Sequence, residues 1–168
     1  MAKLEIKIYP DPVLRKKAKQ VAKVGNDERR LAYDMIETMH AANGVGLAAP
    51  QIGISRRIIV VEDADGGNKL ALVLINPKIT QKKGRVSFCE GCLSLPGISS
   101  EVVRPESITV EALNLDGDVL KINAKGLLAR IIQHEIDHLD GIVFIDRIGF
   151  LKRKRIMKQL GAKVCMKF

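Results

Sequence analysis

The chain has 168 residues, of which 46% are hydrophobic and 28% charged, and it carries a formal net charge of +9. This length suits a single domain, residues 1–168, and no apolar run is long enough to cross a membrane as a helix. The three cysteines are odd in number, which argues against a disulfide framework and leaves metal ligands or free thiols.

The N-terminal segment alternates apolar and charged residues from Met1 to Lys7. It therefore lacks the continuous apolar core of a signal peptide, and the sequence predicts a cytoplasmic protein. Pro10 and Pro12 follow, and each proline fixes its own φ and restricts the residue before it. We expect an ordered, extended or turning arm here.

A first helix is predicted from a cap at Asn26 or Asp27 to a stop at Asn43-Gly44. His40, close to its end, is typical of a partner for the helix dipole rather than of a ligand. The next segment, Gly44–Gly53, is rich in small residues that let the backbone approach another group closely, with Gln51 as a candidate directed amide. It lacks the Lys-Ser/Thr ending of a phosphate loop. The core-facing positions of the helix are Leu31, Met35, Ile36, Met39 and Ala42.

The middle of the chain is predicted to be mainly antiparallel strands. Turn signals at Asp65–Asn68 and Asp116-Gly117 indicate two hairpins, and Asn76-Pro77 is expected to end the second strand. The predicted strands are residues 57–62, 70–75, 85–88, 99–103, 107–113 and 119–122.

A later helix begins near Leu127 and ends at Gly141, and it contains His134, Glu135 and His138. Residues four apart stack on one helix face, so the two imidazoles lie side by side with the carboxylate next to them. These groups fall within the apolar arc, where burial without partners costs about 2 to 7 kcal/mol each. The pattern predicts a metal site with an adjacent general base; the alternative is a pair of hydrogen-bonded core histidines.

The polar side of this helix is expected to carry Arg130, Gln133 and Asp137. After it, residues 147–168 hold eight Lys or Arg and no acidic residue. A basic helix is predicted over Phe150–Leu160, and its charge indicates a polyanionic partner. Nucleic acid or a ribonucleoprotein is favoured over a membrane surface as that partner. A solvated helix face is the alternative.

Two histidines do not complete a metal site, and the segment Cys89-Glu90-Gly91-Cys92 offers two arrangements. Both cysteines could close a four-ligand structural zinc site, or one thiolate could bind and leave a position open. In a strand, residues three apart point to opposite faces, and only one would then reach the helix. Glu135 favours the open site, because a structural site has no use for a carboxylate beside the ion. The chemistry that follows is metal-assisted hydrolysis of an amide.

Three segments together resemble the peptide deformylase family, in its bacterial type 1-like form: Gly44–Gln51, Glu90–Ser94 and Gln133–His138. Their order and spacing match that family, as does the arm Pro10–Arg15. The resemblance implies an α+β fold, with antiparallel or mixed strands around the metal-binding helix, an N-terminal helix and a basic C-terminal helix. It implies a metallohydrolase that removes the formyl group from formyl-methionyl nascent peptides and releases formate.

The resemblance also implies roles for individual residues. The metal ligands are Cys92, His134 and His138, the acid/base is Glu135, and Gln51 and the Leu93 N–H stabilise the oxyanion. Fe(II) is the expected native ion, with Zn, Ni or Co possible in purified protein. Residues expected to bind substrate are Val45, Gly46, Glu90, Gly91, Leu127, Arg130 and Ile131.

The basic helix fits the tail with which family members contact the ribosome near the tunnel exit, and neither a membrane nor DNA is expected as a partner. Cys89 lies just outside the motif, and a pair of Cys89 and Cys92 that is prone to oxidation stays open as an alternative. The alternative from another class is an RNA-binding module in which a closed Cys2His2 zinc site stabilises the fold.

Overall fold

The computed structural model describes residues 3–62 and 71–165, with side chains as far as residue 161. In this range the chain forms three α-helices: α1 (Asn26–Ala41), α2 (Gly126–Leu139) and α3 (Phe150–Cys165). Short 3-10 turns are η1 (Pro12–Arg15), η2 (Ala49–Ile52) and η3 (Phe144–Asp146). The strands are β1 (Gly46–Ala48), β2 (Ile58–Glu62), β3 (Ala71–Lys83), β4 (Val86–Cys92), β5 (Leu95–Arg104), β6 (Ser107–Leu113) and β7 (Val119–Lys125).

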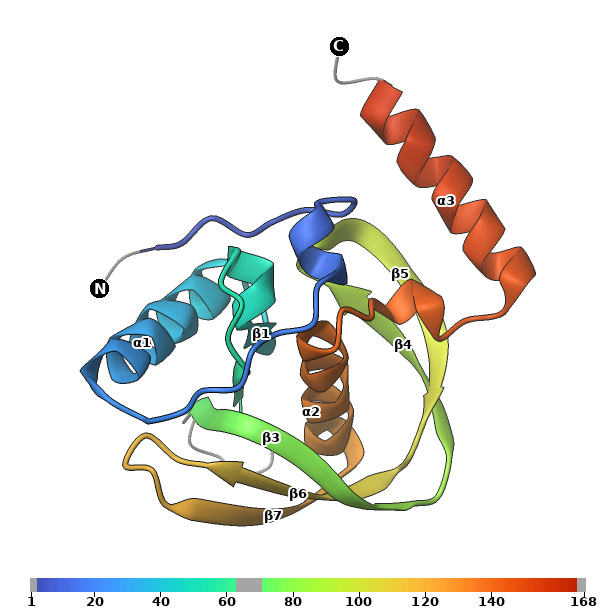
Figure 1. The fold of residues 1–168 in the computed structure, drawn as a ribbon. Coiled ribbons are helices and arrows are strands. Elements are labelled where there is room, and N and C mark those ends of the chain that lie inside the picture. The colour runs from blue at the N-terminus through green and yellow to red at the C-terminus, as the bar shows by residue number, and fades with distance from the viewer. Residues whose placement is uncertain (1–2, 63–70, 166–168) are drawn as a thin grey trace.

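Five strands form one sheet in the order β1-β2-β3-β6-β7, and every neighbouring pair is antiparallel. β4 and β5 form a separate antiparallel hairpin on the other side of α2 (Figure 1). The predicted α+β fold of antiparallel strands around a central helix is confirmed. The predicted turn at Asp65–Asn68 lies outside the described residues, although β2 and β3 pair antiparallel on either side of it.

From Leu128 to Leu139, the central helix α2 is buried on every side, which corrects the expected polar face. Arg130, Gln133 and Asp137 are each only about 5–6% exposed. The apolar stripe of α2 packs on the five-stranded sheet through Leu128, Ile132 and Leu139. The opposite side is covered by β4 and β5, so its polar residues need buried partners and not water.

β3 and β1 differ most from the prediction, and β4, β5 and β7 are also longer than the predicted strands 85–88, 99–103 and 119–122. β3 does not end at Asn76-Pro77 but continues to Lys83, because a register irregularity between Ile75 and Lys78 lets the strand pass the proline. The glycine-rich connection contains a strand of its own, β1, which adds to the edge of the sheet beside β2.

The helices α1 and α3 pack against different parts of the molecule. α1 packs on β1 and β2 through a cluster that includes Leu31, Met35 and Met39, and its N-cap is Gly25, one residue before the predicted cap. α3 extends away from the body in Figure 1, yet Ile156 is buried in a third cluster with Leu95 and Phe144. The helix is therefore held near its middle by an apolar contact of Ile156 and Leu160, while its basic residues remain largely exposed.

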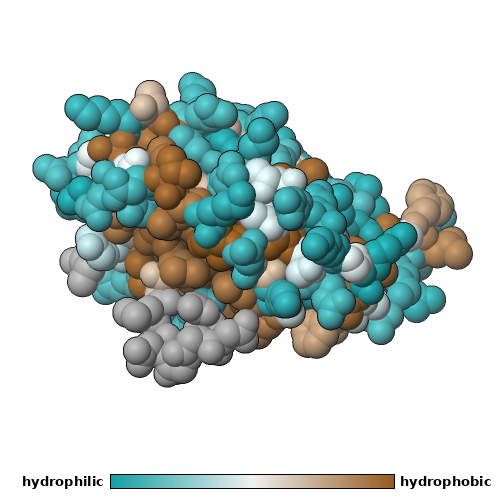
Figure 2. Space-filling model, turned by 90° about the horizontal axis from the view of Figure 1, so that it is seen from below, coloured by the Kyte–Doolittle hydropathy of each residue, from teal (hydrophilic) through white to brown (hydrophobic). Residues whose placement is uncertain are grey.

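The surface is mostly hydrophilic. On the face shown in Figure 2, hydrophilic residues cover most of the area, and hydrophobic residues gather near its middle. Among the described residues, none of the helices combines the length and apolar character that a membrane crossing requires.

Candidate metal centre and active site

Helix α2 and the end of β4 bring three metal-ligating side chains together. The rings of His134 and His138, one turn apart on α2, have their centroids 5.0 Å apart. Cys92, the last residue of β4, places its Sγ 3.2 Å from Nε2 of His138. One ligand atom from each of the three residues lies within 4.8 Å of the others. These are the three residues that the family resemblance implies as metal ligands, in the open one of the two arrangements considered from the sequence.

Cys89 does not join this group. It lies three residues earlier on β4, paired with Glu101 of β5, and is exposed. A register shift between Gly91 and Cys92 turns the end of the strand, and only Cys92 reaches α2. Within residues 3–62 and 71–165, the closed four-ligand arrangement is therefore not formed.

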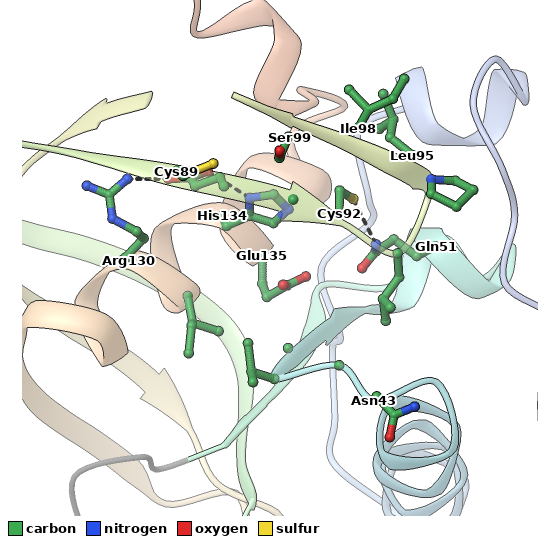
Figure 3. A pocket seen from close by; sticks show the side chains of 18 of the residues that line it. Asn43, Gln51, Cys89, Cys92, Leu95, Ile98, Ser99, Arg130, His134 and Glu135 are labelled. Carbon is green, nitrogen blue, oxygen red and sulfur yellow. Dashed lines mark hydrogen bonds and ion pairs between the residues drawn. The ribbon is translucent and has the colours of Figure 1, made fainter. Parts of the chain in front are cut away.

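Glu135 occupies the position expected of a general base. Its side chain points into the pocket beside His134 (Figure 3), and its Oε2 is buried without a hydrogen-bond partner among the described residues. Burial raises the pKa of Glu135 to about 7, against the opposing effect of His134 and Arg104. A carboxylate with a pKa near neutrality can both accept and donate a proton at physiological pH.

The two histidines have different electrostatic surroundings. Burial lowers the pKa of His134, but hydrogen bonds to Cys92 and Glu90 outweigh it and raise the pKa to about 10. Burial and the neighbouring His134 lower the pKa of His138 well below its usual value. The surroundings of the two rings therefore stabilise a positive charge on His134 but not on His138. A bound cation would supply this positive charge in place of the proton.

Glu90 lies behind His134. Its Oε2 is 3.0 Å from Nδ1 of His134, and both carboxylate oxygens accept hydrogen bonds from Arg104, at 2.7 and 2.9 Å. Arg130 adds a third charged contact at 2.5 Å. Although burial opposes ionisation, the bonds to His134 and Arg104 lower the pKa of Glu90 to about 2. The carboxylate is ionised and fully engaged.

Gln51 approaches from η2, on the opposite side of Cys92. Its Oε1 accepts from the Ala48 N–H at 2.8 Å, which directs its Nε2 towards Cys92 Sγ at 3.5 Å and Ser94 Oγ at 3.2 Å. The predicted directed amide is thus turned towards the thiolate (Figure 3). The orientation follows from this network, because only the nitrogen can donate.

A cavity of about 680 Å³ opens beside these groups, a size in the usual range of small-ligand sites. Its lining includes every predicted site residue except His138, which lies deeper. The predicted residues on its wall are Val45, Gly46, Gln51, Glu90, Gly91, Cys92, Leu93, Leu127, Arg130, Ile131, His134 and Glu135.

Two residues of the site were missed in the sequence. Ser94 is completely buried and accepts from Gln51, and Arg104 joins Glu90 to Asp137. The alternation of β5 would place Arg104 on the same inward face as Val102, and this was the available signal. His40 pairs with Glu62 at 3.1 Å and is not part of the metal-ligand group.

Comparison with known proteins identifies what this arrangement is similar to. The sequence profile described as polypeptide deformylase matches residues 3–154. A peptide deformylase of Thermodesulfovibrio yellowstonii is 50% identical over 164 residues, covering 97% of this chain and 99% of that protein. One of Alkalilimnicola ehrlichii is 50% identical over 160 residues, covering 95% of this chain and 90% of that protein.

Solved structures give the same result. A peptide deformylase from Legionella pneumophila superposes with a TM-score of 0.90 at 43% identity, over 99% of this chain and 98% of that one. One from Ehrlichia chaffeensis, in complex with actinonin, gives 0.89 at 41% identity, over 97% of this chain and 98% of that one.

Proposed function

The chain belongs to the polypeptide deformylase family, and we propose that residues 1–168 act as one catalytic domain that removes the formyl group from N-terminal formyl-methionine. It is a metal-dependent hydrolase that acts on nascent polypeptides and releases formate. The observation that carries the assignment of roles is the group Cys92, His134 and His138, with the unpartnered oxygen of Glu135 beside it.

The residues present fit a divalent metal ion. One thiolate and two imidazoles are donors for late first-row metals, and their ligand atoms lie within 4.8 Å of one another. Glu90 engages Nδ1 of His134, which leaves Nε2 of that ring for the ion. The sulfur of Cys92 lies 3.5 Å from Nε2 of Gln51 and 3.2 Å from Nε2 of His138. Cys92, His134 and His138 would therefore hold the ion.

The native ion is proposed to be Fe(II), with Zn, Ni or Co able to replace it in purified protein. A thiolate with two neutral imidazoles accepts each of these ions, and their relative abundance decides which one binds. Metal analysis of protein purified without oxygen tests this: iron at one equivalent is expected, and zinc alone under those conditions would contradict it.

When bound, the ion supplies Lewis acidity, which polarises the formyl carbonyl and lowers the pKa of water. Glu135 is the proton carrier of the reaction. Its Oε2 takes the proton of the attacking water and delivers it to the leaving amide nitrogen. The buried position of this oxygen, with no other partner among the described residues, supports the role.

Two donors are proposed to stabilise the negative charge that develops on the carbonyl oxygen. The first is Nε2 of Gln51, whose direction is set by the bond between its Oε1 and the Ala48 N–H. The second is the backbone N–H of Leu93, which follows the ligand Cys92 and lines the same cavity. A prepositioned donor of this kind contributes about 3 kcal/mol in other hydrolases.

The methionine side chain is proposed to enter the apolar part of the cavity. Val45, Leu127 and Ile131 line this part next to His134. The peptide backbone would extend along β1, whose outer edge is free in the sheet order, near Gly46 on one side and Gly91 on the other. Arg130 lines the cavity although its guanidinium is buried and bonded to Glu90, and Glu90 was predicted as a further contact.

The reaction is tested by comparing three peptides that differ only at the N-terminus. A formyl-Met peptide is expected to be hydrolysed with release of formate, whereas the acetylated and the unmodified peptide remain intact. Cleavage of an internal peptide bond in all three would instead indicate a general metallopeptidase.

The partner of the basic tail is proposed to be the ribosome near the tunnel exit, in the cytoplasm, where formylated chains emerge. Lys154, Arg155 and Lys158 of α3 are exposed, and the helix contains no acidic residue. Because α3 extends away from the body (Figure 1), these residues can contact a polyanionic surface without blocking the cavity. Neither DNA nor a membrane is proposed as a partner.

A further inference from the structure

Arg104 is the centre of a buried group of charges behind the metal ligands. It is the last residue of β5 and is 4% exposed. Its Nε and Nη2 donate to the two oxygens of Glu90 on β4, at 2.7 and 2.9 Å, and its Nη1 donates to Oδ2 of Asp137 on α2, at 2.8 Å. One guanidinium therefore joins a strand of the hairpin to the central helix.

Those two elements are the ones that carry the ligands. Cys92 is at the end of β4, two residues after Glu90, and His134 and His138 flank Asp137 on α2. The distance between the thiolate and the two imidazoles depends on how closely β4 approaches α2. Arg104 spans this gap with three charged hydrogen bonds, which are shorter and stronger than neutral ones.

The group also orients one ligand directly. Oε2 of Glu90 lies 3.0 Å from Nδ1 of His134, and because an ionised carboxylate can only accept, the ring donates its Nδ1–H and Nε2 is the atom that a cation would take. The same Glu90 oxygen accepts from Nη2 of Arg104 at 2.9 Å. Arg104 thus holds the carboxylate in the position from which it fixes the tautomer of His134.

Two other arginines each contact one of the two carboxylates but not both. Arg130 also contacts Glu90, at 2.5 Å, yet it reaches no acidic residue of α2 and donates its other bonds to backbone carbonyls of Val86 and Val102. Arg147 contacts Asp137, at 2.5 and 3.1 Å, but not Glu90. Of the described residues, Arg104 alone is hydrogen-bonded to both Glu90 and Asp137.

We propose that Arg104 is a positioning residue of the metal centre, which clamps β4 to α2 and holds Glu90 on His134, and so determines how tightly the three ligands bind a divalent cation. The inference rests on the metal site of the proposed function. It assigns Glu90 to ligand orientation instead of the substrate contact expected from the sequence, because both oxygens of Glu90 are already engaged.

The test is the affinity of the full-length, metal-free protein for Co(II), measured by competition with a chelator and by the absorption bands of the bound ion. Arg104→Lys keeps the positive charge but cannot bind both carboxylates through a planar fork. We expect its dissociation constant to rise about 10- to 100-fold, the usual effect of removing an outer-shell partner, and the absorption bands to shift.

Arg57→Lys is the matched control. Arg57 donates to Asp140 at 2.7 Å just beyond the end of α2, and its side chain is 12% exposed, but it does not contact Glu90 or Asp137. Its Co(II) affinity should equal that of the unmodified chain. A second variant, Glu90→Gln, should weaken Co(II) binding, and adding Arg104→Lys to it should cause little further loss, because both changes act on the same ring.

A folded Arg104→Lys protein that melts at a lower temperature without its metal, yet binds Co(II) with unchanged affinity and spectrum, would reduce Arg104 to a purely structural ion pair and overturn the proposal. If Arg104→Lys does not fold, Asp137→Asn replaces it, and unchanged Co(II) affinity there has the same meaning. No substrate enters these measurements. A chain that binds Co(II) as expected but leaves formyl peptides intact would overturn the proposed function and not this inference.

Discussion

Gly46 of β1 lies directly against the carboxylate of Glu135 on α2: a Cβ at residue 46 would be 2.5 Å from Oε1 of Glu135 and 2.7 Å from Cγ2 of Ile131. Side-chain carbon atoms do not approach other heavy atoms so closely. The glycine-rich segment was predicted to let backbone approach another group, and that group is the proposed base. The position of Glu135 is thus limited on one side by the backbone of the sheet edge.

Gly46→Ala is expected to displace the carboxylate of Glu135 while the fold persists. A shift of about 1 Å in a catalytic group can lower turnover about 100-fold, and overpacking costs about 1 to 3 kcal/mol of stability. Turnover of a formyl-Met peptide and urea unfolding measure the two effects. Gly149→Ala is the control, because no atom lies within 4 Å of its added Cβ; equal turnover in both variants would contradict the close-contact explanation.

Glu135→Gln is expected to retain the metal and lose most of its turnover. The amide has nearly the same shape but cannot accept a proton, and removal of a general acid/base lowers the rate by about 10²- to 10⁴-fold. Metal content and turnover are measured on the same sample. Asp140→Asn, an equivalent change just beyond α2, should leave both unchanged, and full turnover in Glu135→Gln would remove Glu135 from the mechanism.

The two cysteines are expected to respond differently to serine. Cys92→Ser should lose most of the bound metal, because a hydroxyl is a much weaker ligand for these ions than a thiolate. Cys89→Ser should keep full metal content and turnover, since Cys89 is exposed and outside the ligand group. Metal analysis after dialysis distinguishes them, and loss of metal from Cys89→Ser would favour the closed structural site.

Reversal of charge on α3 is expected to abolish co-sedimentation with ribosomes without affecting hydrolysis of small peptides. The variant combines Lys154→Glu, Arg155→Glu and Lys158→Glu, all exposed and away from the buried Ile156. This design is preferable to truncation, which would uncover the third apolar cluster around Phe144.

A matched control carries the same change in net charge on another surface. Lys78→Glu, Lys83→Glu and Lys125→Glu lie on the exposed side of β3 and β7, which Figure 1 shows far from α3. This variant should still co-sediment. Equal loss in both triple variants would mean that net charge and not α3 determines binding, and retention by the α3 variant would exclude the tail as the contact.

Asp146 is expected to stabilise the fold only where its carboxylate is ionised. Burial opposes ionisation, but the hydrogen bond from Arg15, with help from the Val143 N–H and Arg153, lowers the pKa of Asp146. A lowered folded-state pKa means that the stabilisation is complete above the unfolded pKa, about 3.9, and is lost as the pH falls through the folded value.

Asp146→Asn should therefore cost about 1 kcal/mol at neutral pH, the upper range for an ion pair at the protein surface, because the Asp146 side chain is only partly buried. The difference from the unmodified chain should shrink as the pH falls below about 4. Urea unfolding of both metal-free proteins across this range measures it, with Glu37→Gln on the exposed side of α1 as control. A difference that stays constant down to acid pH would show that Asp146 acts through shape and not charge.

Local spacing in the sequence was sufficient for the catalytic helix and its chemistry. His134, Glu135 and His138 are within five residues of one another, and the pitch of a helix alone places them side by side. The same is true of Gly46, where the absence of a side chain indicated close approach of the backbone. The histidines and Glu135 lie within one helix, and Gly46 is informative through its residue type alone. Neither feature depends on how the remaining chain folds.

Which cysteine lies beside the two histidines was left open by the sequence and depends on tertiary structure. Cys89 and Cys92 are the same residue type, so the sequence alone does not say which of them reaches α2. This depends on the register of β4 against β5 and on the irregularity at Gly91. The length of β3 beyond Pro77 likewise depends on a bulge against β6. Such features arise from pairing between distant segments, which a local pattern does not contain.

The polar side of α2 shows the same division most clearly. By helical period alone, Arg130, Gln133 and Asp137 belong on a solvated face, and that prediction was wrong. The β4–β5 hairpin covers this face and supplies Glu90 and Arg104 as partners for its charges. The sequence by itself indicated the groups that are proposed to carry the chemistry. Only the folded structure decided which charges are buried together, because residues over 30 positions apart must meet in a region without water.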